Sequence, residues 1–176
     1  MRLIDALAEV LRKHYQAKVN LSKDMLAKER RDASGRLSAS LRPIDKVLSE
    51  TVAELDLIAE DYWKYIDKGV KGWQNVNAPQ DSPFQYKKKF IPISALQGAG
   101  GWIAMKGLIT TGQDAKERNT ALAKVLQTSI PKKGIRATRF ITDVFDADQV
   151  KELKAELSKA HVQFTANDIR KNGNND

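Results

Sequence analysis

A short aromatic stretch, residues 60–72, constrains the fold more than any other part of the chain. It places Tyr62, Trp63 and Tyr65 within four positions, a quarter of the twelve Trp, Tyr and Phe residues in the sequence. Helical spacing puts Tyr62 and Tyr65 on one face, and two acidic residues precede them, as the helix dipole favours. Gly69 then supplies a residue that accepts a left-handed conformation at a helix end. We therefore expect a short capped helix that packs against the rest of the protein and exits sharply.

The overall composition is that of an ordinary globular protein, with 41% hydrophobic and 30% charged residues in a chain of 176. This length predicts one domain over residues 1–169, with an N-terminal helical arm over about 1–32 and a flexible tail over 170–176. No apolar run approaches the ~20 residues that cross a bilayer. Asp5 and Glu9 interrupt the N-terminal apolar pattern, which is wrong for a signal peptide. We expect the protein to stay in the cytosol or in a particle that assembles there.

Few groups in the sequence suit catalysis or metal binding. The chain has no cysteine, and its two histidines, His14 and His161, are far apart. Thiolate chemistry is thereby excluded, and a multi-histidine metal site is not expected. Carboxylate pairs stand at apparent helix starts, where capping explains them. The glycine-rich residues 98–101 lack the Gly-Lys-Ser/Thr ending of a phosphate-binding loop. We predict no enzyme, no cofactor and no metal site.

Basic residues outnumber acidic ones, 30 to 22, which implies acidic partners. The excess is spread along the chain, and this favours a solvated basic surface. The strongest nucleic-acid feature is the run Lys87-Lys88-Lys89 between Tyr86 and Phe90, because cations beside aromatic rings can hold phosphates and stack on bases. A small basic protein that binds nucleic acid without sequence preference therefore remains an alternative function.

The N-terminal region predicts a long helix followed by a short one. Residues 2–20 carry apolar side chains at helical spacing, with a break at Asn20 or Ser22. Residues 22–34 contain few apolar side chains and extend the helix as a solvated arm or form a linker. Ser34 is the expected cap of the next helix. Pro43 ends that helix, since the residue before a proline avoids the helical region.

Residues 44–59 fit two structures. Helical spacing fits Val52 and Leu55, whereas alternation fits every second residue from Ala53. The strand alternative is a hairpin with residues 49–50 in its turn. Periodicity alone slightly favours a helix. The segment also has no Gly or Asn that could form a tight hairpin turn.

The next segment, residues 70–92, contains three prolines and predicts a long irregular loop with a short strand near its end. Loops longer than about 12–15 residues are usually functional or mobile. This loop carries Trp73, Phe84 and Tyr86, and exposed aromatic side chains on a loop are typical of docking to a partner.

The C-terminal half predicts three helical regions. Glycines interrupt the first, residues 93–107, whose expected buried side comprises Trp102, Ile103, Met105 and Leu108. The second runs from Asp114 to Ile130 and is expected to stop at Pro131. The last begins at Asp143 or Asp146 and ends near Phe164.

Three pieces of sequence, taken in order, resemble a known family. They are Ala33-Ser-Gly-Arg-Leu-Ser-Ala-Ser-Leu41, Tyr62-Trp-Lys-Tyr-Ile-Asp-Lys-Gly-Val-Lys-Gly72 and Ser129-Ile-Pro-Lys-Lys-Gly-Ile-Arg-Ala-Thr-Arg-Phe-Ile141. Together they resemble the tail-completion and head–tail joining proteins of tailed bacteriophages, most closely those from phages of Bacteroidetes hosts, including crAss-like phages. The long loop after Trp73 and the glycines at 98–101 depart from the usual pattern of that family.

The resemblance implies an α+β fold with a long N-terminal helix, a small antiparallel sheet and several packed helices, including a C-terminal one. It also implies that residues 44–48 and 52–58 form a hairpin, against the periodicity. In function it implies a virion protein of the neck, assembled in the host cytoplasm as a homo-oligomeric ring. Its partners are then itself, the portal or adaptor and the tail proteins, with non-specific contact to packaged DNA and no membrane. The interface residues are then Tyr62, Trp63, Trp73, Phe84 and Tyr86, and the DNA-facing residues Lys87, Lys88, Lys89, Lys132 and Lys133.

Overall fold

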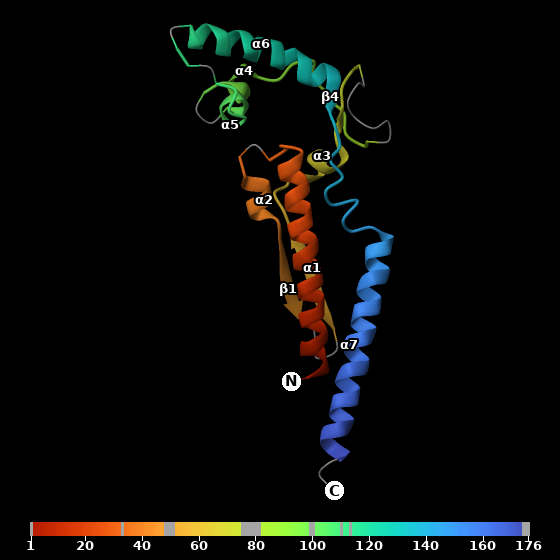
Figure 1. The fold of residues 1–176 in the computed structure, drawn as a ribbon. Coiled ribbons are helices and arrows are strands. Elements are labelled where there is room, and N and C mark those ends of the chain that lie inside the picture. The colour runs from red at the N-terminus through yellow and green to blue at the C-terminus, as the bar shows by residue number, and fades with distance from the viewer. Residues whose placement is uncertain are drawn as a thin grey trace.

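The computed structural model describes residues 2–32, 34–47, 52–74, 82–98, 101–109, 111–112 and 114–173. Figure 1 shows an elongated molecule with two parts. A column contains α1 (Leu3–Lys28), α7 (Ala147–Gly173) and a β-hairpin. A head lies across one end of the column and contains α4 (Ile93–Leu96), α5 (Trp102–Met105) and α6 (Ala115–Lys133). Helix α1 begins and helix α7 ends toward the opposite end of the column, with α7 extending beyond the start of α1 (Figure 1).

The expected α+β class is confirmed, with two small sheets in place of one. Strand β1 (Arg42–Val47) pairs antiparallel with β2 (Ala53–Ile58), and β3 (Val70–Lys71) pairs antiparallel with β4 (Gly134–Ile135). Two short helices complete the described elements: α2 (Arg36–Ser40) lies between α1 and β1 within the column, and α3 (Trp63–Lys68) lies between β2 and β3, where the column meets the head. Among the described residues, no helix is long and apolar enough to cross a membrane.

Helix α1 does not break at Asn20 or Ser22 but runs on to Lys28, as in the alternative in which residues 22–34 extend the helix. Ser22 is fully buried, and its hydroxyl donates a hydrogen bond to the carbonyl of Phe140, 2.8 Å away. The Ser22 hydroxyl therefore bonds to a partner distant in the sequence and does not compete for the backbone hydrogen bonds of its own helix. The helix contacts both strands of the hairpin and α7, so it lies within the packed structure along much of its length.

Residues 42–47 and 53–58 form the two strands of the hairpin and not a helix. The register pairs Arg42 with Ile58 and Val47 with Ala53. The periodicity was misleading, and the strands implied by the resemblance are confirmed. Leu57 packs against the core, while the neighbouring acidic side chains are exposed. This alternation is what a sheet with one covered face requires. The predicted turn at residues 49–50 lies outside the described residues.

The main core joins segments that are far apart in the sequence. Its fully buried members are Val19, Leu26, Leu37, Leu41 and Phe140. These side chains come from α1, the region of α2 and the loop before α7, so burying them holds the column together.

Helix α2 begins with a different cap from the one predicted. The Asp32 carboxylate accepts hydrogen bonds from the backbone amides of Leu37 and Ser38, at 3.3 and 2.6 Å. Ser34 reaches only the amide of Arg36, at 3.4 Å. A carboxylate at a helix start also gains from the helix dipole, which explains why Asp32 is the more effective cap.

Helix α6 continues through Pro131, where we had expected it to stop. A proline inside a helix leaves the carbonyl four residues earlier without its donor. Here that carbonyl belongs to Gln127, and the backbone amide of Ile91 donates to it at 3.0 Å. The extended segment before α4 therefore replaces the lost hydrogen bond, and the helix reaches Lys133.

The head has its own core of Leu96, Ile103 and Ala123, against which Trp102 packs. The expected buried side of residues 93–107 is correct for Ile103. It is wrong for Met105 and Leu108, which are 40% and 44% exposed. The interrupted helix forms two separate single turns, α4 and α5, so its side chains do not keep one helical face.

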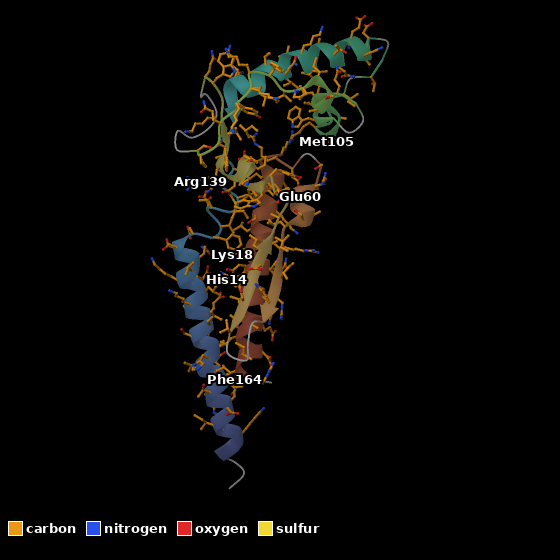
Figure 2. The ribbon with its side chains drawn as sticks, turned by 180° about the vertical axis from the view of Figure 1, so that it is seen from behind. His14, Lys18, Glu60, Met105, Arg139 and Phe164 are labelled. Carbon is orange, nitrogen blue, oxygen red and sulfur yellow. The ribbon has the colours of Figure 1, made fainter. Side chains whose placement is uncertain are left out.

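Helix α7 is longer than predicted. Asp146 starts it by accepting the amides of Asp148 and Gln149, and it continues to Gly173. Residues 170–173, expected in a flexible tail, are therefore helical. Side chains of α1 link it to α7. His14 contacts Glu156 and Lys18 contacts Glu152, each at 3.0 Å (Figure 2).

Candidate partner-binding surface

Three segments meet where the column joins the head, and we call this place the junction: residues 69–74, 82–86 and 131–136. Strands β3 and β4 form its centre. On the other side of β3, the amide of Lys71 donates to the carbonyl of Phe84 at 2.8 Å, and the amide of Tyr86 donates to the carbonyl of Lys71 at 3.0 Å. The short strand predicted near the end of this loop is reduced to a single parallel bridge between Gln85 and Lys71, and backbone hydrogen bonds tie the segment to β3.

Trp73 is held at the end of α6. Its backbone amide donates to the carbonyl of Pro131 at 3.1 Å, and the amide of Gln74 donates to Lys132 at 2.9 Å. The Lys132 ammonium lies 5.7 Å from the centroid of the Trp73 ring, within the range of a cation–π interaction. The indole nevertheless remains 48% exposed. The chain thus presents a large aromatic side chain to solvent on a fixed backbone.

The other aromatic side chains of the junction are less accessible. The Phe84 ring packs edge-on against Tyr65, with centroids 4.5 Å apart. The buried Ser82 hydroxyl donates to the carbonyl of Gly69 at 2.8 Å and fixes the loop beside these rings. Tyr86 is half-buried, and burial raises the pKa of its phenol. These residues support the junction, whereas Trp73 projects from it.

Asp67 locks the junction to the column. Its fully buried carboxylate accepts hydrogen bonds from the amides of Ile141 and Thr142, at 2.8 and 3.1 Å, and from the Thr142 hydroxyl at 2.5 Å. Its own carbonyl accepts the amide of Arg139 at 2.9 Å. The Asp67 side chain therefore accepts the hydrogen bonds of three donors in a turn that lies more than 70 residues away in the sequence. Sequence analysis did not single out Asp67, because nothing local marks an aspartate in a short helix as buried.

Close contact between two backbone segments explains why position 134, in the junction, is a glycine. Gly134 has a φ of +84°, and a Cβ there would lie 2.4 Å from the carbonyl oxygen of Val70. Only glycine accepts both that conformation and that approach. Gly69 takes a φ of +71° at the end of α3, as predicted from its position.

The junction gathers most of the residues predicted to contact partners or DNA. Trp73, Phe84, Tyr86, Lys132 and Lys133 belong to it, and the exposed run Lys87 to Lys89 follows it directly. Tyr62 and Trp63 lie elsewhere, with half-buried side chains that pack against the main core. The candidate surface is therefore Trp73 with Lys132 over its ring, together with the exposed Lys133 and Lys87 to Lys89.

The three sequence pieces that suggested a family also meet in space. The first contributes Leu37 and Leu41 to the main core, and the third contributes Phe140. The second piece contains β3 and the third contains β4, and these two strands pair with each other. The backbone amide of Ile141, in the third piece, also donates to the carboxylate of Asp67, in the second. Their spacing in the sequence therefore reflects one structural unit.

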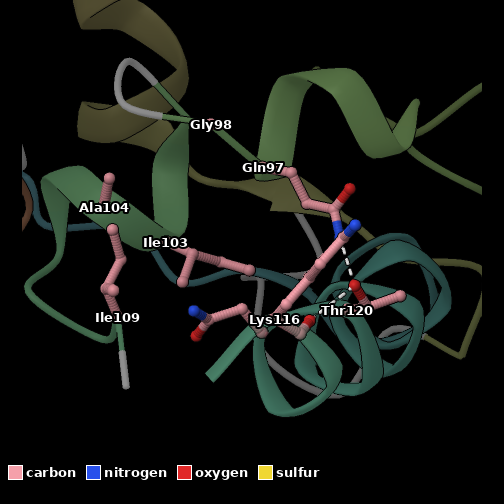
Figure 3. A pocket seen from close by; sticks show the side chains of 8 residues that line it. Gln97, Gly98, Ile103, Ala104, Ile109, Lys116 and Thr120 are labelled. Carbon is pink, nitrogen blue, oxygen red and sulfur yellow. Dashed lines mark hydrogen bonds between the residues drawn. The ribbon is translucent and has the colours of Figure 1, made fainter. Parts of the chain in front are cut away.

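A separate hollow of about 330 Å³ lies between α5 and the start of α6 (Figure 3). Its lining includes Ile103 and Ile109, and two of its polar side chains, Gln97 and Thr120, bond to each other at 3.3 Å. The Thr120 hydroxyl in turn donates to the carbonyl of Lys116 at 2.8 Å. These two side chains are therefore engaged with each other and with the backbone. Within the described part of the chain, no three potential metal ligands cluster.

A scan against protein-family models, a search of curated proteins and a search of solved structures each found no match to this chain.

Proposed function

We propose that this chain is a structural virion protein of the neck of a tailed phage, a head–tail connector or tail-completion subunit. In this proposal it assembles as a homo-oligomeric ring between the portal or adaptor and the tail. The resemblance of three sequence pieces suggests the class, and their convergence on one structural unit supports it. The proposed role is mechanical and requires no catalytic group.

The observation that carries the proposal is the exposure of Trp73. The indole is 48% exposed, although backbone hydrogen bonds on residues 73 and 74 fix its position. Tryptophan is enriched among the residues that dominate binding energy at protein interfaces, and a preorganised side chain loses little entropy on binding. We infer that Trp73 inserts into a neighbouring subunit.

The lysines in and directly after the junction suit a position near DNA. Lys133 and residues 87–89 are exposed, and Lys132 lies over the indole. Basic side chains of this kind contact phosphates without selecting a sequence. In the proposed ring they line or border the channel for packaged DNA.

The alternative is a small basic protein that binds nucleic acid without sequence preference. The exposed lysines favour it, and so does Phe90, which follows them and is 56% exposed, but the aromatic side chains of the junction do not. Phe84 packs on Tyr65, Tyr86 is half-buried and Lys132 already occupies one face of the Trp73 ring. Stacking on bases requires open ring faces. The arrangement therefore favours a protein partner over single-stranded nucleic acid.

A Trp73→Ala variant tests the proposal in particles assembled by the phage that encodes the chain. A buried tryptophan anchor contributes about 2 kcal/mol or more to an interface, which corresponds to an affinity loss of about 30-fold. We expect the variant to fold normally and to be depleted from purified particles. Val125→Ala, which truncates a residue 62% exposed on α6, is the matched control and should be incorporated like the wild type.

The two functions predict different outcomes for the same variants. If the chain acts alone on nucleic acid, Trp73→Ala does not change the amount of the protein found in purified particles. The isolated protein then binds DNA tightly and in a salt-dependent way, and replacing Lys87, Lys88 and Lys89 by Gln weakens that binding. Tight DNA binding by a monomer that is absent from particles would exclude the neck assignment.

A further inference from the structure

A cavity of about 510 Å³ lies where the head meets the column. Its walls come from α3, α4, α5, α6 and β4 and from the segment after α1. Most of this lining is apolar: Ile66, Ile91, Leu96, Trp102, Ile130 and Ile135. This volume falls in the range of pockets that bind small molecules, which are usually apolar with a few polar groups.

Three cations border the same cavity: Arg31, Lys106 and Arg136. No carboxylate is found among its described lining residues, and none of the three cations forms an ion pair with a described residue. Arg31 and Lys106 are partly buried beside this apolar wall, where a positive charge loses hydration, whereas Arg136 is exposed at the border.

Arg31 shows this cost most directly. Its Nε atom is buried and has no hydrogen-bond partner. Lys106 donates to the backbone carbonyl of Arg30, and burial together with the charge of Arg31 lowers the pKa of its ammonium. The nearby carboxylate of Asp32 is already occupied as the cap of α2, through two backbone amides. Because this atom is closed off from the cavity as well as from solvent, a ligand in the cavity would meet Arg31 through the rest of its side chain.

We propose that this cavity binds a small anionic amphiphile, a molecule with an apolar body and one carboxylate, sulfonate or phosphate group. The body lies against Trp102 and the isoleucine side chains. The anion accepts hydrogen bonds from Arg31 and Lys106, and Arg136 adds positive charge at the border. Such a ligand fills the apolar space of the cavity with its body and neutralises the positive charges at the border with its anionic group. It also bridges the head and the column, so its binding stabilises their relative position.

The test compares two ligands of equal chain length, decanoate and 1-decanol, by isothermal titration calorimetry on the full chain. Decanoate is kept below the concentration at which it forms micelles. We expect one decanoate per chain and at least about tenfold weaker binding of decanol, the effect of one hydrogen bond to a charged group. Equal binding of the two ligands, or no binding of decanoate, would overturn the proposal.

Variants assign the site. Arg31→Gln is expected to weaken decanoate binding by about tenfold or more without lowering the stability of the unliganded protein, since it removes an unpartnered donor. Arg136→Gln changes an exposed residue that cannot affect folding strongly, and it should also weaken binding. Arg170→Gln, at the far end of α7, is the control and should bind like the wild type. Equal affinities in all three variants would contradict the assignment.

Discussion

The buried carboxylate of Asp67 provides a sharp test of how the junction is held. Asp67→Asn keeps the shape of the side chain and an acceptor for the amides of Ile141 and Thr142. It removes the negative charge and replaces the carboxylate oxygen, Oδ2, that accepts the hydrogen bond of the Thr142 hydroxyl at 2.5 Å. Hydrogen bonds to charged groups contribute about 1.5–3 kcal/mol each, so we expect a loss of about 2 kcal/mol in the free energy of unfolding.

Asp67→Ala should be more severe. It leaves two buried backbone donors without an acceptor, at a cost of about 1–3 kcal/mol each, so the expected loss is about 4 kcal/mol. The assay is urea unfolding followed by far-UV circular dichroism. Asp61→Asn, an exposed change just before α3, is the control and should stay within about 0.5 kcal/mol of the wild type.

A double-mutant cycle isolates the hydroxyl contact. If Asp67 and Thr142 interact as described, Thr142→Val costs less in the Asp67→Asn background than in the wild type, with a coupling of about 1 kcal/mol. Additive effects, or an Asp67→Asn loss no larger than that of Asp61→Asn, would refute the role given to this carboxylate.

Further predictions concern the junction glycine, its tyrosine and helix α1. Gly134→Ala should destabilise the protein by roughly 3 kcal/mol, whereas Gly98→Ala, at a similar φ of +89° but with open space around it, should cost about 1 kcal/mol in the same unfolding assay. Burial raises the pKa of Tyr86 above the ordinary value of 10.0, so its contribution to stability is complete below pH 10 and is lost as the pH rises further. Tyr86→Phe should therefore flatten the alkaline decrease in stability, and an unchanged slope would contradict this. Ser22→Ala should cost about 1 kcal/mol, because it leaves the Phe140 carbonyl unpaired, and no loss would show that this bond is not needed.

The features that sequence analysis predicted well are local. The positive φ of Gly69 and the start of α7 at Asp146 follow from single residues beside a helix end. The hairpin at 42–58 did not follow from periodicity, since its spacing fits a helix as well, and only the resemblance implied it. Local signals of this kind decide a helix end, but they do not decide between two regular structures.

The errors share a physical cause, which is a partner distant in the sequence. Ser22 stays inside α1 because its hydroxyl reaches Phe140, and Pro131 stays inside α6 because Ile91 bonds the carbonyl that the proline leaves free. The buried state of Asp67 depends on a turn at residues 139–142 in the same way. The aromatic residues of the loop after α3 were predicted as surface anchors, and Trp73 alone among them is largely exposed, because Phe84 and Tyr86 pack inward at the junction.

The most direct test of the proposed function is electron cryomicroscopy of the particles made by the phage that encodes this chain. The account predicts density for repeated copies at the portal vertex, arranged as a ring, with Trp73 at the contact between one copy and a neighbouring subunit. It would be contradicted by well-resolved density of the neck into which this chain does not fit, in particles where mass spectrometry detects the portal and tail proteins but not this protein.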